Sequence, residues 1–257
     1  MKSISLYSDN GSWLVKLHPF SKLFYLAAVI LIPLISGHLF VFGITIFLSI
    51  CMLGSARMLR KALPLIAFSF TIILTIFLIQ GIFYKDNDAL LFSLGPVNFY
   101  REGLLYSARI GFNILNMLLS FSVLVLTTSP SELVEELEKK GFSPKFGYII
   151  NSVFQIVPEM MGTMHTISDA QRSRGMETEG KLMTRLKAFL PLISPVVMSA
   201  LTSTRERAIA LEVRGFGSKV KKTYLYSHPY STLDRIMKWV SILSLLTVII
   251  LRVTCIL

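Results

Sequence analysis

The chain has 257 residues, of which 53% are hydrophobic and 16% are charged, and its mean hydropathy is +0.63. Soluble domains typically carry about a quarter of charged residues, so the composition excludes an ordinary water-soluble protein. The net charge of +11 does not indicate a nucleic-acid partner here, because membrane proteins collect Lys and Arg in their cytoplasmic loops.

Five apolar stretches approach the length of about 20 residues that a helix needs to cross a bilayer. Their approximate bounds are 23–36, 38–54, 62–84, 104–128 and 236–255. The first two are separated only by Ser36-Gly37-His38, which predicts a tight helical hairpin. The sequence therefore predicts an all-α, polytopic membrane protein with about five transmembrane helices.

The basic residues between the apolar stretches predict the orientation. Lys16 and Lys22 precede the first stretch and RMLRK (57–61) follows the second, whereas Ser36-Gly37-His38 contains no Lys or Arg. Because Lys and Arg mark cytoplasmic loops, the amino terminus is predicted to be cytoplasmic. The predicted domains are an N-terminal membrane domain (1–128), a cytoplasmic insertion (129–232) and a C-terminal transmembrane helix (233–257).

A further apolar run at 188–203 is predicted to lie at the cytoplasmic face. It is shorter than a span and contains Pro191 and Pro195. If it crossed the membrane, the basic segment that follows it would lie outside the cell, which the charge rule disfavours. The insertion therefore remains on one side of the membrane.

Three helices are predicted in the insertion. The first opens at Ser129-Pro130, with Glu132 completing a capping box, and the second follows Ser143-Pro144. The third starts near residue 181. The second helix is predicted to end at Ser173-Arg174-Gly175 and the third at Val213-Arg214-Gly215.

The two helix endings share the pattern Ala-x-x-x-Arg-Gly, beginning at Ala170 and Ala210. Glycine favours the left-handed backbone that ends a helix, and a cation in the last turn interacts favourably with the helix dipole. Capping alone requires neither arginine in place of lysine nor the upstream alanine. An exposed guanidinium can donate several hydrogen bonds to carboxylates or carbonyls in a groove. Two such endings predict two similar grooves on a dimeric partner.

Over nearly its whole length the chain resembles the transmembrane (T) component of energy-coupling factor (ECF) importers, the EcfT/CbiQ-like family. WLVKLHPFSKL (Trp13–Leu23) is similar to the Leu-Asp-Pro-Arg-x-Lys-Leu segment of that family, although His18 and Phe20 replace the acid and the base. LRKALPLI and TTSPSELVEELEKKGFSP are also similar. The two x-Arg-Gly motifs match the paired signature of the family's coupling helices, with Ser173 and Val213 where alanine is common.

The resemblance implies a non-catalytic coupling subunit of an ATP-driven importer for a vitamin, cobalt or nickel. Its implied partners are two ABC ATPase subunits, identical or different, and a substrate-binding membrane (S) subunit. The implied location is the bacterial or archaeal cell membrane, and no cofactor is implied. The residues assigned to ATPase coupling are Ser173, Arg174, Gly175, Val213, Arg214 and Gly215.

Two residue patterns bear on these partners. The chain has no Gly-x-x-x-x-Gly-Lys-[Ser/Thr] phosphate loop, so ATP hydrolysis is expected on separate subunits. Flexible methionines suit a surface that repacks against a partner such as an S subunit, or fill gaps between helices. Six of them lie in the insertion: Met160, Met161, Met164, Met176, Met183 and Met198.

Two other function classes have less support in the sequence. An ion-coupled secondary transporter usually keeps ionisable residues deep in the membrane. The spans here offer Arg109 near one end and the neutral Gln80, Asn113 and Asn116, whose simpler role is hydrogen bonding between helices. A membrane enzyme has less support still. The four histidines form no metal-binding or general-base motif; they are His18, His38, His165 and His228. Cys51 and Cys255 lie in apolar runs, match no metal-ligand spacing and are expected to be packing residues.

Overall fold

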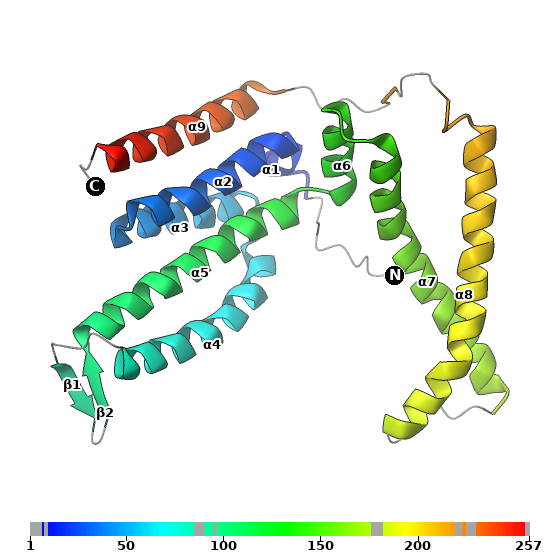
Figure 1. Ribbon diagram of the computed structural model, residues 1–257, viewed down its shortest axis with the longest axis horizontal. Helices are drawn as coiled ribbons and strands as arrows, with labels where there is room; N and C mark the ends of the chain where they lie inside the picture. The colour runs from blue at the N-terminus through cyan, green and yellow to red at the C-terminus, as the bar shows by residue number, and fades with distance from the viewer. Residues whose placement is uncertain are drawn as a thin grey trace. The chain divides into compact units, whose positions relative to one another are not determined.

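The computed structural model describes residue 7 and the ranges 10–84, 90–94, 97–175, 182–218, 223–224 and 230–254. His228, Cys255 and Met176 lie outside these residues. The described chain forms two compact units (Figure 1). Unit 1 comprises Met1–Ile4 and Glu138–Ser227, and unit 2 comprises Ser5–Leu137 and His228–Leu257.

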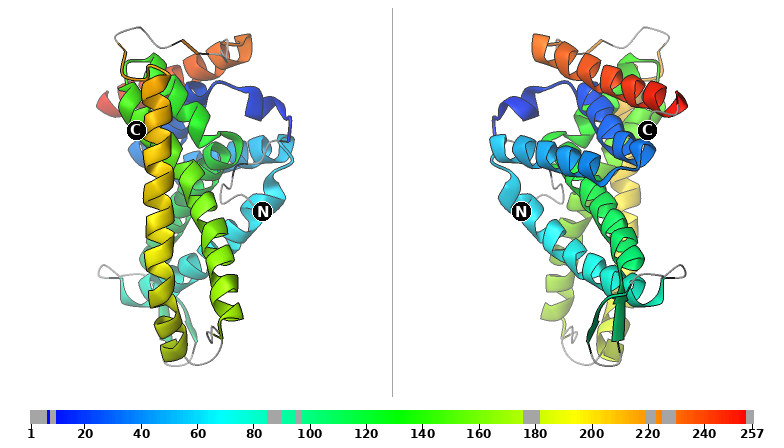
Figure 2. Two further views of the ribbon diagram at one scale, coloured as in Figure 1. Left: turned by 90° about the vertical axis from the view of Figure 1, so that its right-hand side faces the viewer. Right: turned by 90° about the vertical axis from the view of Figure 1, so that its left-hand side faces the viewer.

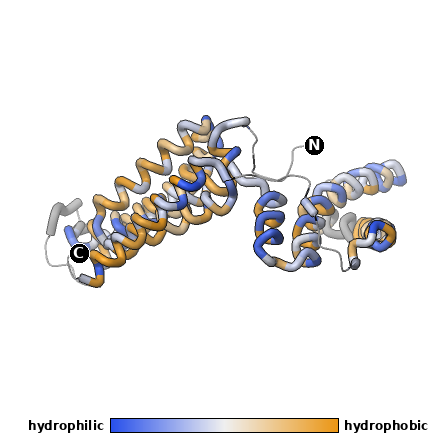
Figure 3. The backbone as a smooth tube through the Cα atoms, turned by 90° about the horizontal axis from the view of Figure 1, so that it is seen from above, coloured by the Kyte–Doolittle hydropathy of each residue, from blue (hydrophilic) through white to orange (hydrophobic). Residues whose placement is uncertain are grey.

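Unit 2 contains the apolar helices, which are mostly hydrophobic along their length (Figure 3). Its elements are α1 (Trp13–Lys16), α2 (Pro19–Ser36), α3 (Leu39–Ser55), α4 (Leu59–Phe83), β1 (Leu90–Leu94), β2 (Val97–Tyr100), α5 (Arg101–Thr127), most of α6 (Pro130–Lys139) and α9 (Thr232–Val253). Helix α5 packs against α2, α3 and α4, and α2 packs against α9.

Four described helices have the length and composition of membrane spans, namely α2, α4, α5 and α9. Helix α3 is apolar but has 17 residues, just under one turn fewer than the about 20 that a span typically needs. The predicted hairpin between the first two apolar stretches is confirmed, since α2 ends at Ser36 and α3 begins at Leu39. The chain is a multi-pass, all-α membrane protein, as its composition predicts.

The buried core of unit 2 lies where α2, α3 and α5 meet the start of the chain. Leu14 and Leu17 contribute to it from the α1 region, and Leu119, Val123 and Leu126 from one face of α5. By contrast, α4 and α9 leave most of their large apolar side chains exposed. In a bilayer such side chains meet lipid rather than water, so their exposure carries no hydrophobic cost.

A short antiparallel hairpin joins α4 to α5 and was not predicted. Strands β1 and β2 pair from Leu94↔Val97 to Leu90↔Tyr100, with an irregularity between Leu90 and Phe92. The two strands are mostly apolar and contain the aromatic residues Phe92, Phe99 and Tyr100, which suit a strand. Its strands have five and four residues, too few for the sequence pattern to stand out beside the long apolar helices.

Unit 1 is built on two long helices, α7 (Pro144–Ser173) and α8 (Leu182–Val213). They run in opposite directions and cross (Figures 1 and 2). Helix α8 is not among the described helices with the length and composition of a span; the cytoplasmic location predicted for 188–203 stays a prediction. Both predicted helix endings are confirmed, since α7 ends at Ser173 and α8 at Val213.

Arg57, at the turn between α3 and α4, has an unfavourable backbone conformation. Its φ of +54° is left-handed. Its N–H donates to the carbonyl of Gly54 (2.9 Å), and the N–H of Met58 donates to that of Leu53 (2.9 Å). These two bonds place Arg57 at the position after a helix end where glycine is preferred.

We therefore expect Arg57→Gly to stabilise the protein by about 1 kcal/mol, because glycine lacks the Cβ that crowds this conformation. The midpoint of thermal unfolding in detergent should rise by a few degrees. Arg57→Ala is the control, since alanine keeps the Cβ and should give no increase. A Tm for Arg57→Gly at or below that of the wild type would contradict this account.

Candidate functional site

The end of α7 presents Arg174 at the surface. The N–H of Arg174 donates to the carbonyl of Gln171 (3.1 Å), and that of Gly175 donates to Arg172 (2.9 Å). Gly175 has a φ of +86°, which ends the helix by turning the chain into the left-handed region. The hydroxyl of Ser173 donates back to the carbonyl of Asp169 (3.1 Å). The arginine therefore sits on the last turn of a well-formed helix end.

The end of α8 is built in the same way. The N–H of Gly215 donates to the carbonyl of Glu212 (2.9 Å) and that of Phe216 to Leu211 (3.0 Å), the paired bonds of a Schellman ending. Gly215 has a φ of +73°. Arg214 is exposed, as is Val213 before it. The two x-Arg-Gly motifs thus take the same helix-end position.

The two arginines are not brought together. Because α7 and α8 are antiparallel, their carboxyl-terminal ends point away from each other (Figure 1). Each arginine lies about 20 Å along its helix from the middle of the crossing, where Met160 and Ala200 line the shared hollow, at 1.5 Å rise per residue. The structure thus presents two separate arginine tips on one pair of helices.

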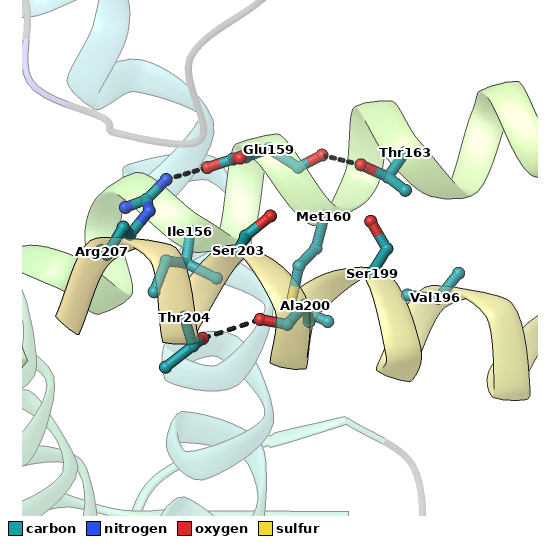
Figure 4. A pocket seen from close by; sticks show the side chains of 10 residues that line it. All are labelled: Ile156, Glu159, Met160, Thr163, Val196, Ser199, Ala200, Ser203, Thr204 and Arg207. Carbon is teal, nitrogen blue, oxygen red and sulfur yellow. Dashed lines mark hydrogen bonds and ion pairs between the residues drawn. The ribbon is translucent and has the colours of Figure 1, made fainter. Parts of the chain in front are cut away.

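A salt bridge and small side chains join α7 and α8 where they cross (Figure 4). Arg207 on α8 pairs with Glu159 on α7. Beside this pair, Ser199, Ala200 and Ser203 line a small hollow that they share with α7. Small residues let two helix backbones approach closely. The crossing therefore holds the two helices in one arrangement.

A second polar group, buried in unit 2, was missed by the sequence analysis. We call it the polar junction, and it consists of His18, Lys22, Thr127, Glu136 and Asp234. These residues come from α2, the end of α5, α6 and α9, and all five are buried. Buried polar groups are costly unless they are hydrogen-bonded, so their mutual contacts define the arrangement of these helices.

His18 makes the central contacts of the polar junction. Its Nδ1 accepts from the N–H of Phe20 (3.2 Å), which caps α2. The proton is therefore on Nε2, which donates to Glu136 Oε2 at 2.9 Å. The N–H of His18 donates to Asp234 Oδ1 (2.8 Å), and the ring stacks on Tyr230 with centroids 3.9 Å apart. Burial, followed by the charges of Glu136 and Asp234, raises the pKa of the Tyr230 hydroxyl.

Lys22 caps two helix ends at once. Its Nζ donates to the carbonyl of Thr127 at the end of α5 (2.8 Å) and to that of Val15 in α1 (3.3 Å). The last carbonyls of a helix lack partners within the helix, and they carry the negative end of its dipole. The buried ammonium group of Lys22 gives these carbonyls a hydrogen-bond donor, and it places a positive charge at the negative end of the helix dipole.

Part of this junction was visible in the sequence. HPFSK places His18 and Lys22 four residues apart around Pro19, at the start of an apolar helix. Polar residues on one face of such a helix need partners, but the sequence does not identify them. The predicted role of Asn116 is confirmed, since its Nδ2 donates to the carbonyl of Val29 on α2 (2.7 Å).

Together these features define an all-α, multi-pass membrane protein that carries a pair of crossed helices with exposed arginine tips. Residues 10–225 match the family described as cobalt transport protein, CbiQ, and the chain belongs to this family.

Similar curated proteins carry the name "Energy-coupling factor transporter transmembrane protein EcfT". One from Staphylococcus aureus (strain 04-02981) is 28% identical over 86% of this chain and 85% of its own length. One from Brevibacillus brevis is 27% identical over 96% of each chain, and one from Bacillus subtilis (strain 168) is 26% identical over 83% and 84%. The chain is thus a transport protein of the type that forms the transmembrane component of ECF transporters.

Proposed function

We propose that this chain couples ATP hydrolysis to import by inserting Arg174 and Arg214 into grooves on two ABC ATPase subunits, identical or different. The observation that carries the proposal is the matched construction of the two tips. Each places an exposed arginine one residue before a left-handed glycine, at opposite ends of the crossed pair. Two equivalent cations on one chain fit a partner that offers the same groove twice.

Arginine suits this role better than lysine. Its guanidinium presents five donors in a rigid plane and can bind a carboxylate through two parallel bonds. Each hydrogen bond to a charged group contributes about 1.5–3 kcal/mol. The glycines Gly175 and Gly215 end the helices, so that the arginines meet the partner first. Ser173 and Val213 complete the two tips.

In this mechanism, closure of the ATPase dimer on ATP moves the two tips, and α7 and α8 transmit the movement to the spans. The salt bridge between Arg207 and Glu159 holds the helices together while they move. The ATPase active sites lie on the partner subunits, because this chain has no phosphate-binding loop. Residues 129–232 act as the coupling domain, between the membrane domain (1–128) and the last helix (233–257).

The arrangement requires the amino terminus and the coupling domain to be cytoplasmic. The basic residues support this orientation, since Arg57, Arg60 and Lys61 follow α3 on the side predicted to be inside. Exposed methionines on the coupling helices, Met161, Met183 and Met198, offer an adaptable surface to a substrate-binding S subunit. A vitamin, cobalt or nickel is the proposed cargo of that complex.

The test is purification of the tagged chain from its native membrane, followed by reconstitution into liposomes. We expect two ABC ATPase subunits to co-purify, and uptake of labelled cobalt(II), nickel(II) or vitamin to require internal ATP. Uptake without ATP that stops when an ion gradient is collapsed would instead support a secondary transporter. Failure to recover any ABC ATPase would also reject the proposal.

A further inference from the structure

We propose that His18 is a positioning residue that fastens both connections to the coupling helices onto the membrane helices, and so passes their movement to α2 and α9. The inference rests on the proposed function and adds a residue outside the two arginine tips. It starts from where the chain leaves and rejoins unit 2. The first part of unit 2 ends at Leu137, and the first residue described after the chain returns to unit 2 is Tyr230.

His18 contacts both of these segments. Glu136, bonded to its Nε2, is one residue from the point where the chain leaves unit 2. Tyr230, stacked on its ring, is the first residue described after the chain returns to unit 2. A displacement of the segment at Glu136 or of the segment at Tyr230 therefore acts on the same imidazole ring. His18 is only 2% exposed.

From His18 the contacts continue into two membrane helices. Its Nδ1 caps the start of α2. Its backbone N–H binds Asp234, whose other carboxylate oxygen accepts from the N–H of Ser231 (2.9 Å) at the start of α9. Asp234 also accepts, through its carbonyl, from the hydroxyl of Ser21 on α2 (3.3 Å). Because these groups are buried and hydrogen-bonded to one another, displacement of α6 or of the segment at Tyr230 is expected to shift α2 and α9.

The charges of the polar junction require a donor at position 18. The carboxylates of Glu136 and Asp234 both accept a hydrogen bond from His18. The side-chain Nε2–H donates to Glu136, and the backbone N–H donates to Asp234. An aspartate at this position could still cap α2 but would face Glu136 with a like charge. His18→Asp should therefore break the link, and His18→Asp combined with Glu136→Gln should restore it, because the glutamine amide can donate to the new carboxylate.

The experiment measures hydrogen exchange by mass spectrometry in the complex with its ATPase subunits, with and without ATP. In the wild type, ATP should change exchange in α7, α8, α2 and α9. In His18→Ala and His18→Asp the change should persist in α7 and α8 and fall about threefold to tenfold in α2 and α9, the range expected for a residue on a coupling route. The double variant should recover most of the response.

Asn116→Ala is the matched control, since Asn116 is buried and joins α5 to α2 away from both connections. It should lower the Tm but leave the ATP response of α2 and α9 intact. A normal response in both His18 variants, or an equal loss in Asn116→Ala, would overturn the inference. Lack of any response in α7 and α8 of the wild type would instead reject the proposed function itself.

Discussion

Replacing Arg174 and Arg214 together with alanine is expected to abolish ATP-driven uptake and to release the ATPase subunits from the purified complex. Both side chains lie exposed at helix ends, so their removal leaves the fold of unit 1 intact. Truncating one partner of a buried charged pair at an interface costs about 2–5 kcal/mol. Each single variant should therefore weaken binding of the ATPase subunits at least about tenfold, and the double variant should weaken it more than either single variant.

Arg172→Ala is the control that separates the effect of Arg174 and Arg214 from the loss of any arginine at the end of α7. Arg172 lies in the same last turn of α7, where it makes a long surface pair with Asp169 (4.0 Å), and such pairs contribute little. Its loss should leave ATPase capture and uptake near the wild-type level. Arg174→Lys should recover only part of the binding, because lysine lacks the planar donor fork. Normal uptake by a well-expressed double alanine variant would refute the proposed docking.

Lys22→Met is expected to destabilise the protein by about 2–4 kcal/mol. Methionine fills a similar volume, but the carbonyls of Thr127 and Val15 lose a charged donor, and Thr127 is fully buried away from water. A hydrogen bond to a charged group contributes about 1.5–3 kcal/mol, and the cost of burying the ammonium offsets part of the sum. Thermal or SDS-induced unfolding of the purified chain measures the loss.

Lys238→Met serves as the matched control in the same unit. Lys238 lies over the ring of Phe24 at 5.2 Å from its centroid, on a part of α9 that is only half-buried. An interaction of this kind contributes about 0.5–1 kcal/mol at an accessible site. Equal stability losses for the two variants would show that Lys22 contributes no more than an ordinary surface lysine.

The elements that were predicted correctly from the sequence are those whose bounds depend only on residues adjacent in the chain. The apolar runs predict where helices lie because a bilayer requires a minimum length. The glycines after Arg174 and Arg214 predict where α7 and α8 end, because left-handed backbone is cheap for glycine alone. The hairpin of β1 and β2 was missed because its strands are short and lie between two long apolar helices.

The polar junction could not be assembled in the same way. His18 and Asp234 are 216 residues apart in the sequence, and Lys22 and Thr127 are 105 apart. Nothing local indicates that Nε2 of His18 faces Glu136. An isolated histidine at the start of an apolar helix is compatible with many partners, and only packing selects one.

The membrane class, most of the helix bounds and the two arginine endings were predictable without coordinates, because each follows from the chemistry of neighbouring residues. The fold places the arginine tips at opposite ends of the crossed pair, and it brings five helices, α1, α2, α5, α6 and α9, together around His18 and Lys22; neither arrangement follows from neighbouring residues. The reason is that a buried polar group must find its partner wherever the fold places one. That choice depends on the packing of segments distant in the chain.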